Sequence, residues 1–165
     1  MNGISIRSCE VGDLEAVSAL LGETWHATYD NIYGAERVSA LTKSWHSIGT
    51  LTENLGQVDA TFLVAEREVR ILGTAFARLD VETAKLMCDR IYVHPDAQGT
   101  GVGYALLGEL IVRSGPAERI CLEVESMNTR AIAFYERAGF KVTGQGTDCG
   151  GMGDNIDHLI MERTL

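Results

Sequence analysis

The stretch that decides the fold, residues 91–107, reads Ile-Tyr-Val-His-Pro-Asp-Ala-Gln-Gly-Thr-Gly-Val-Gly-Tyr-Ala-Leu-Leu. It begins with β-branched and aromatic residues, passes a proline and three alternate glycines, and ends in residues with helical spacing. This order predicts a strand, a tight loop and a helix. The first N–H groups of a helix have no partner within it, and glycines let a ligand approach such bare backbone closely. Because the helix dipole also favours negative charge there, the stretch predicts a pyrophosphate-binding loop.

The length and composition bound the class of protein. The chain has 165 residues, of which 45% are hydrophobic and 22% are charged. These values are ordinary for a globular protein that buries its core without disulfides or metals, so we expect a single domain over residues 1–165. The N-terminal residues lack the apolar core of a signal peptide, and no segment has the length of a membrane span. We therefore expect a cytoplasmic protein that does not bind membranes.

Charge and cysteine usage restrict the partners. The net charge is −9, from 14 basic and 23 acidic residues, which argues against nucleic acid and fits a cationic or neutral partner better. The four cysteines are Cys9, Cys88, Cys121 and Cys149. They are far apart in sequence and show no Cys/His ligand spacing, so the sequence predicts neither disulfides nor a metal site. Cys88 and Cys121 fall in strand-like runs and are expected to be buried thiols.

The spacing of apolar residues predicts the remaining elements. Strands are expected at residues 4–6, 61–65, 71–77, 85–93, 120–125, 140–143 and 156–163, and helices at 13–28, 35–41, 48–55, 102–112 and 129–138. The glycine-rich stretch Gly144 to Gly153 is expected to be a loop. Strands that first pair as hairpins and are then linked through helices predict a mixed α/β sheet.

The glycine loop lacks the full signatures of other nucleotide sites. It has the spacing G-x-G, but Leu106 stands where a dinucleotide fingerprint needs its third glycine, and no Gly-Lys-Ser/Thr follows. On the glycines alone, a ligand loop and a simple turn are about equally well supported, so the choice depends on the surrounding residues.

A second motif supplies that context. From Asn128 to Phe140 the chain reads Asn-x-x-Ala-x-x-Phe-Tyr-Glu-x-x-Gly-Phe. Together the two motifs resemble those of the GNAT superfamily of acyl-CoA-dependent N-acetyltransferases, closely over residues 85–144, and the other elements match the family's order. The resemblance implies a mixed, mostly antiparallel sheet that is splayed between its fourth and fifth strands and flanked by helices.

The resemblance also implies acetyl-CoA as co-substrate, with its pantetheine arm in the gap between the splayed strands. Backbone groups of the strand would bind that arm and the acetyl carbonyl, the loop amides would bind the pyrophosphate, and Asn128 would contact the arm or hold the splayed strand. The residues that it implies for coenzyme binding are Ile91, Tyr92, Val93, Gln98, Gly99, Thr100, Gly101, Val102, Gly103, Asn128 and Tyr135. Many members carry Lys or Arg at the positions of Thr100 and Tyr104, so here backbone amides would do more, with Arg130 or Arg137 as outer contacts.

The catalytic residues follow from the same comparison. The tyrosine at the position of Tyr135 lies near the coenzyme sulfur in this family and protonates the departing thiolate, although a helix tyrosine can also simply pack on the core. The Glu that often serves as base is replaced by Met87. We rank Asp89 first and Glu123 second as bases. On an ideal strand Asp89 shares the parity of Ile91 and Val93, but a bulge near the splay point would change its face.

The acceptor is less well defined by sequence. Trp25, Tyr29 and Tyr33, with the closing segment Met152 to Met161, resemble segments of bacterial spermidine-type acetyltransferases, which favours a polyamine or other small amine held by aromatic and charge contacts. The spacing of Trp25 and Tyr29 fits core residues equally well. The Leu-Glu-Val at residues 122–124 instead resembles ribosomal-protein N-terminal acetyltransferases. A protein N-terminus or lysine as acceptor, a non-catalytic acyl-CoA sensor, and a homodimer all stay open.

Overall fold

The computed structural model describes residues 3–149 and 155–165. The strands are β1 (Ile4–Ser8), β2 (Ala60–Arg67), β3 (Arg70–Asp80), β4 (Lys85–Val93), β5 (Arg119–Glu125), β6 (Lys141–Gly146) and β7 (His158–Thr164). The α-helices are α1 (Leu14–Tyr33), α2 (Ala35–Trp45), α3 (Ile48–Leu55), α4 (Val102–Arg113) and α5 (Thr129–Arg137), and two short 3-10 helices are η1 (Val11–Asp13) and η2 (Pro95–Ala97). Within the described ranges, no helix is long and apolar enough to cross a membrane.

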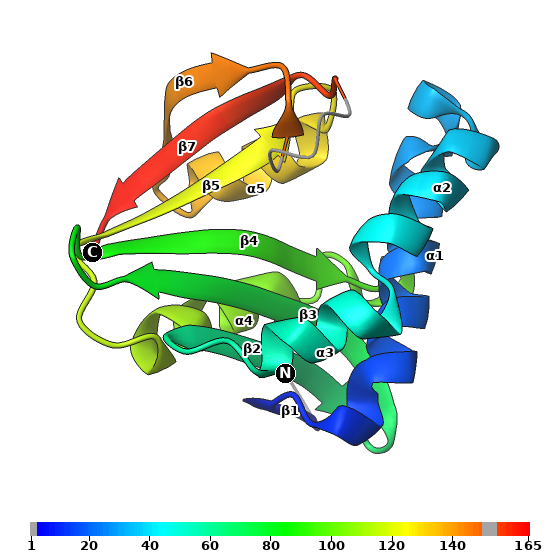
Figure 1. Cartoon of the computed structure of the whole chain (residues 1–165), viewed down its shortest axis with the longest axis horizontal. Coiled ribbons are helices and arrows are strands. Elements are labelled where there is room, and N and C mark those ends of the chain that lie inside the picture. Colours follow the sequence, from blue (N-terminus) through cyan, green and yellow to red (C-terminus); the bar gives the residue numbers. More distant parts are fainter. Residues whose placement is uncertain (1–2, 150–154) are drawn as a thin grey trace.

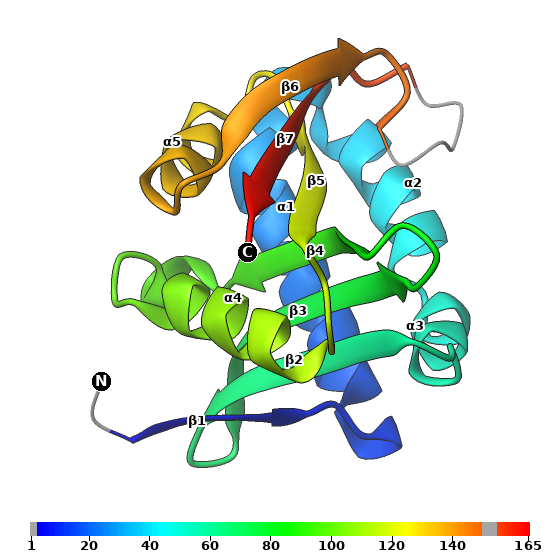
Figure 2. The ribbon, with the colours of Figure 1, turned by 90° about the vertical axis from the view of Figure 1, so that its left-hand side faces the viewer.

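The strands form one seven-stranded sheet in the order β1-β2-β3-β4-β5-β7-β6. Neighbours are antiparallel except β4 and β5, which are parallel. That parallel pair joins only Lys85–Cys88 to Arg119–Leu122, and beyond it the two strands diverge (Figure 1). Figure 2 shows β5 and β7 running steeply across the direction of β1 to β4. The predicted mixed sheet, splayed between its fourth and fifth strands, is confirmed.

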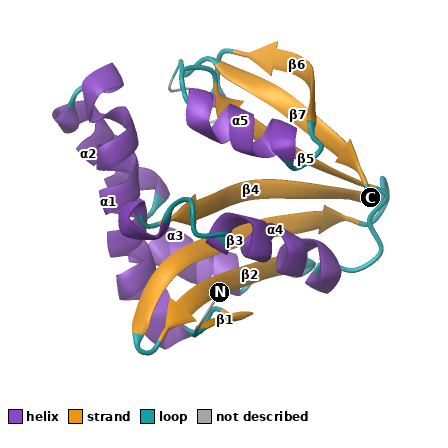
Figure 3. Cartoon of the chain, turned by 180° about the vertical axis from the view of Figure 1, so that it is seen from behind, coloured by secondary structure: helices purple, strands orange, loops and turns teal. Residues whose placement is uncertain are grey.

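Helices cover both faces of the sheet because the inner strands carry apolar residues on both sides. On β2, Leu63 and Ala65 join the cluster under α4 and α5, whereas Phe62 and Val64 join the one under α1 and α3. The i, i+4, i+8 spacing of Val102, Leu106 and Leu110 gives α4 the apolar stripe that it buries in the first cluster. Figure 3 shows α4 and α5 together on the face opposite α3.

Most element predictions agree with the structure, and the differences occur at element ends. The first helix continues to Tyr33 and α2 extends to Trp45. The prediction that a loop begins at Gly144 is wrong: residues 144–146 remain in β6 because they pair with residues 158–160 of β7. Residues 150–154 of the predicted loop lie outside the described residues.

Candidate active site

The splay between β4 and β5 opens into a cavity of about 900 Å³. One wall comes from the glycine loop and α5, through residues such as Gly101 and Tyr135, and another comes from α1, through Trp25 and Tyr29. The diverging parts of β4 and β5 line the cavity between these walls. Since α5 and α1 pack on opposite faces of the sheet, the cavity reaches both faces, as a site for two substrates requires.

The glycine loop presents a run of unused backbone donors. Gly101 precedes α4 with φ 91°, in the left-handed region where glycine is favoured. Within the described part of the chain, the N–H groups of residues 99–104 make no hydrogen bond. Gln98, Gly99, Gly101 and Gly103 line the cavity. These bare amides at the positive end of a helix dipole suit a pyrophosphate.

Two predicted loop residues can offer a ligand only their backbone. The hydroxyl of Thr100 donates to the carbonyl of Ala97 at 2.6 Å. Val102, the first residue of α4, is fully buried. Neither residue is part of the cavity wall, whereas Arg130 and Arg137 of α5 are, so that helix brings cations to the cavity that the loop lines.

The backbone of β4 faces the gap at alternate residues. The amide of His94 donates to the carbonyl of Leu72 on β3 at 2.8 Å, and alternation along an antiparallel strand then directs the groups of Ile91 and Val93 away from β3. The side chain of Gln98 donates to the carbonyl of Val93 at 2.9 Å, which agrees with that direction. Because β5 has diverged here, these groups are available to a ligand in the gap.

Tyr135 lies on α5 with its ring in the core and lines the cavity. Its ring contacts Phe134 and Phe140, with centroids at 5.1 Å and 5.4 Å. Burial raises the pKa of the phenol well above its usual range, and Cys88, Tyr92 and Tyr29 add smaller effects in the same direction. The phenol is therefore protonated at neutral pH and can act as a proton donor.

Asn128 links α5 to α1. Its Oδ1 accepts a hydrogen bond from the amide of Ala131 at 3.0 Å, which caps α5, and its Nδ2 donates to the hydroxyl of Tyr29 at 3.0 Å. Tyr29 is buried, and burial is the main reason why its pKa is raised. Asn128 thus sets the start of the helix that carries Tyr135.

Asp89 occupies a β-bulge. On β3, Ala77 pairs with Cys88 and Phe76 pairs with Arg90, so Asp89 is an extra residue in β4. The bulge moves Asp89 off the face of Ile91 and Val93. Its two carboxylate oxygens accept hydrogen bonds from Nε and Nη2 of Arg78, both at 2.6 Å, and this bonding raises the pKa of Arg78. Both residues line the cavity.

Glu125 is a cavity residue that sequence reasoning did not select. It is only 4% exposed at the end of β5, where its Oε1 accepts from the hydroxyl of Tyr33 at 2.6 Å and its Oε2 accepts from the amide of Met127 at 2.9 Å. Tyr33 itself is not part of the cavity wall. The alternation of β5, which places Glu125 on the face of Glu123, was a signal that could have identified it.

The aromatic residues of α1 pack as a cluster beside the cavity. The ring of Trp25 lies 4.5 Å from that of Tyr29, 5.3 Å from Trp45 and 6.4 Å from Tyr92. All four line the cavity, and burial raises the pKa of Tyr92 to about 12. Trp25 and Tyr29 are therefore core residues that also present one side to the cavity.

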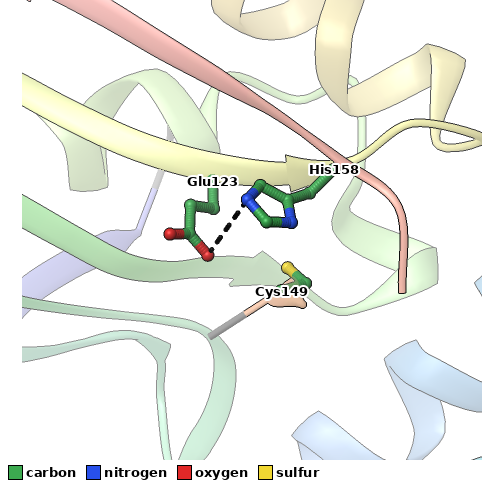
Figure 4. Close-up of side chains that lie close together, drawn as sticks. All are labelled: Glu123, Cys149 and His158. Carbon is green, nitrogen blue, oxygen red and sulfur yellow. Dashed lines mark ion pairs between the residues drawn. The ribbon is translucent and has the colours of Figure 1, made fainter. Parts of the chain in front are cut away.

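Glu123 lies two residues before Glu125 and also lines the cavity. Its Oε2 is 3.8 Å from Nε2 of His158 on β7, and the thiol of Cys149 lies beside both (Figure 4). The β5–β7 pairing brings Glu123 beside His158, and a hydrogen bond from the amide of Cys149 to the carbonyl of Ile156 at 3.2 Å holds Cys149 near the start of β7. Within Met152 to Met161, residues 152–154 lie outside the described part of the chain.

The comparison with protein families agrees with this geometry. A family model described as an acetyltransferase (GNAT) domain matches residues 58–142. This range is more than half of the chain and includes both the glycine loop and Tyr135. The chain therefore belongs to the GNAT acetyltransferase family. It is an N-acetyltransferase, and its acetyl donor is acetyl-CoA.

Individual relatives cover nearly the whole chain. A spermidine N(1)-acetyltransferase from Thermoplasma acidophilum is 26% identical over 145 residues, which are 84% of this chain and 89% of the relative. The crystal structure of PaiA N-acetyltransferase from that organism, in complex with coenzyme A, has a TM-score of 0.82 at 26% identity and covers 98% of this chain and 99% of its own. The ribosomal-protein-S18-alanine N-acetyltransferase from Escherichia coli has a TM-score of 0.73 at 25% identity, covering 98% and 93%.

Proposed function

We propose that the acceptor of this N-acetyltransferase is a small primary amine with further positive charge, of the polyamine class. The observation that supports the proposal is the combination of carboxylates and aromatic rings in the cavity near α1. There Glu123, Glu125, Trp25 and Tyr29 line the same cavity. Carboxylates hold ammonium groups by charge, and aromatic faces attract cations further. The similarity to a spermidine N(1)-acetyltransferase supports the same class of acceptor.

For the coenzyme we propose the residues implied by the motifs. The amides of residues 99–103 would hold the pyrophosphate, and the gap-facing backbone of Ile91 and Val93 would hold the pantetheine arm and the acetyl carbonyl. The amide of Gln98, which the motif also implies, already donates to the carbonyl of Pro95 at 3.2 Å. Asn128 and Tyr135 complete this side of the cavity. The unused donors of the loop and the opening of the β4–β5 pair support this placement.

In the proposed reaction the neutral amine attacks the thioester carbon directly. The carbonyl oxygen gains negative charge as the tetrahedral intermediate forms, and a β4 amide donates to it. The C–S bond then breaks, and the phenol of Tyr135 gives its proton to the departing thiolate. Holding both substrates in one cavity makes the attack effectively unimolecular.

We propose Glu123 ahead of Asp89 as the group that takes the proton from the amine. The bulge moves Asp89 off the face of Ile91 and Val93, whose backbone would hold the acetyl group. Glu123 lies directly on the diverging part of β5. The test compares Glu123→Gln with Asp89→Asn. We expect the larger fall in kcat/KM for Glu123→Gln, and the reverse order would restore Asp89 to first place.

A protein acceptor is the second candidate. The structural similarity to the ribosomal-protein-S18-alanine N-acetyltransferase favours an N-terminal amine as the alternative. In a third hypothesis the domain only senses acyl-CoA: the glycine loop would bind the coenzyme, but no acetyl group would be transferred.

Coenzyme A release across a panel of acceptors separates these functions. The panel should contain spermidine, putrescine, a simple monoamine, a peptide with N-terminal alanine, and a lysine peptide whose N-terminus is blocked. We expect the highest kcat/KM for spermidine and the lowest for the monoamine. A preference for either peptide would overturn the polyamine proposal, and calorimetric binding of acetyl-CoA without release for any amine would favour a sensor.

Location and assembly belong to the proposal as well. We keep the prediction of a cytoplasmic protein, which fractionation of the cells that make it can test. Light scattering on the purified chain decides between a monomer and a homodimer.

A further inference from the structure

Three potential metal ligands converge at the edge of the cavity. They are the carboxylate of Glu123 on β5, the thiol of Cys149 after β6 and the imidazole of His158 on β7. One ligand atom from each lies within 4.8 Å of the other two. Figure 4 shows the three side chains pointing toward one another from different segments of the chain.

The ring of His158 is set up to offer a lone pair to this point. The residue is 6% exposed, and its Nδ1 lies 3.4 Å from the carbonyl oxygen of Ile156. That carbonyl can only accept, so we assign the ring proton to Nδ1 and the lone pair to Nε2. Nε2 makes no hydrogen bond with a described residue, and Oε2 of Glu123 is 3.8 Å away. A backbone carbonyl behind a ligating imidazole is the usual arrangement in metal sites.

The packing of β6 holds the ring in this position. Gly146 pairs with His158 across the two strands. A Cβ at Gly146 would lie 2.6 Å from Cε1 and 2.7 Å from Nε2 of the ring, so the imidazole fits only because residue 146 has no side chain. The ligand atom is therefore fixed before any ligand binds, which lowers the entropy lost on binding.

We propose that Glu123, Cys149 and His158 bind a divalent transition metal ion of the zinc class, leaving one coordination position open to the cavity. Oxygen, sulfur and nitrogen donors of these types bind Zn²⁺ at about 2.0–2.3 Å, which places ligands of a tetrahedral ion about 3.3–3.7 Å apart. The observed spacing of at most 4.8 Å must therefore contract by up to about 1.5 Å. Cys149 lies in the segment after β6 and is only partly buried. It is outside the strand pairing that fixes the other two residues, and its amide donates to the carbonyl of Ile156 at 3.2 Å, so the contraction would come from its side chain.

Coordination needs no oxidant or reductant. The thiol sulfur forms a bond to the metal and releases its proton to solvent, while the carboxylate and the imidazole bind without further change. The sulfur ligand selects Zn²⁺ or Co²⁺ over Mg²⁺ and Ca²⁺, which prefer oxygen. A cation bound here would occupy the α1 side of the cavity and repel an ammonium group, so acetyl transfer to amines would become sensitive to metal.

The test is a Co²⁺ titration of the untagged protein, followed by absorption and then by displacement with Zn²⁺. We expect one Co²⁺ per chain and a thiolate-to-cobalt charge-transfer band, both lost on adding Zn²⁺. In Cys149→Ser the band should vanish and the Zn²⁺ dissociation constant should rise at least about tenfold, since losing even an outer contact of a metal site weakens binding about 10–100-fold. Cys9→Ser, a buried cysteine in the cluster under α1 and α3, is the matched control and should keep the band.

Three outcomes would overturn the proposal: no metal bound at micromolar protein, a charge-transfer band that persists in Cys149→Ser, or the same Zn²⁺ affinity in that variant. His158→Asn should abolish binding too, and circular dichroism checks its fold because the ring is buried. If it does not fold, Cys149→Ser decides alone. Because no readout involves turnover, the result does not depend on the identity of the acceptor.

Discussion

His46 should make the stability of the fold depend on pH, and replacing it should remove that dependence. The residue follows α2 and is 6% exposed, with its ring 5.7 Å from Trp25 and 6.2 Å from Tyr92. Its Nδ1 has no hydrogen-bond partner in the described part of the chain. Burial, with a smaller effect from Arg90, lowers the pKa of His46 to about 3.

The sign and size follow from linkage. The folded pKa is depressed below the unfolded value of about 6.5, so between these values the unfolded chain binds more protons than the folded one. Stability due to this residue is therefore complete above about pH 6.5 and decreases as the pH falls toward 3. At about 1.4 kcal/mol for each pH unit, the step from pH 7 to pH 5 removes about 2 kcal/mol of the free energy of unfolding.

Urea denaturation at the two pH values measures this term. His46→Leu keeps a similar volume without a titrating group, and its loss of stability between pH 7 and pH 5 should be smaller than that of the wild type by about 2 kcal/mol. Other groups titrate in both proteins and cancel. His26→Gln, which removes a part-exposed histidine paired with Asp30, shows whether the effect is specific to His46. An equal loss in His46→Leu and wild type would refute the reasoning.

Three further predictions concern the coenzyme side. Tyr135→Phe should lower kcat by about 100-fold, because the departing thiolate would lose its proton donor, and steady-state kinetics can measure this. An unchanged kcat would remove Tyr135 from its proposed role. Asn128→Ala should destabilise the fold by about 2–3 kcal/mol, because the α5 cap and the bond to Tyr29 are both lost, whereas Asn128→Asp should keep the cap. Equal denaturation curves for Asn128→Ala and the wild type would contradict this. Gly101→Ala should cost about 1–2 kcal/mol because of its positive φ and should weaken coenzyme A binding in calorimetry, and unaltered binding would argue against the amide site.

Most helices and strands could be predicted from local sequence, because their apolar residues recur with clear helix or strand periods. The range predicted for β4, Lys85 to Val93, agrees with the structure at both ends, since a glycine loop bounds the strand on one side. The end of the sixth strand was missed for the opposite reason. Gly144 and Gly146 have low strand propensity, and only the pairing with β7 holds them in the sheet.

In the candidate site, too, local motifs could be predicted from the sequence and long-range pairings could not. Tyr135 and the glycine loop belong to contiguous motifs, and the structure brings them to one cavity. The bulge at Asp89 depends on the pairing with β3, so counting parity along β4 could suggest a change of face but could not establish it. Glu125 and Tyr33 lie 92 positions apart, and no local pattern predicts their contact.

The short β4–β5 pairing also bears on solubility. Where β5 diverges, β4 has an edge inside the sheet, and unpaired strand edges are the usual templates for self-association. Here that edge lies inside the fold and borders the cavity, which residues of α1 and α5 also line. An unpaired edge between two strands of one sheet is less accessible to another chain than an edge at the rim, which natural proteins must cover or blunt.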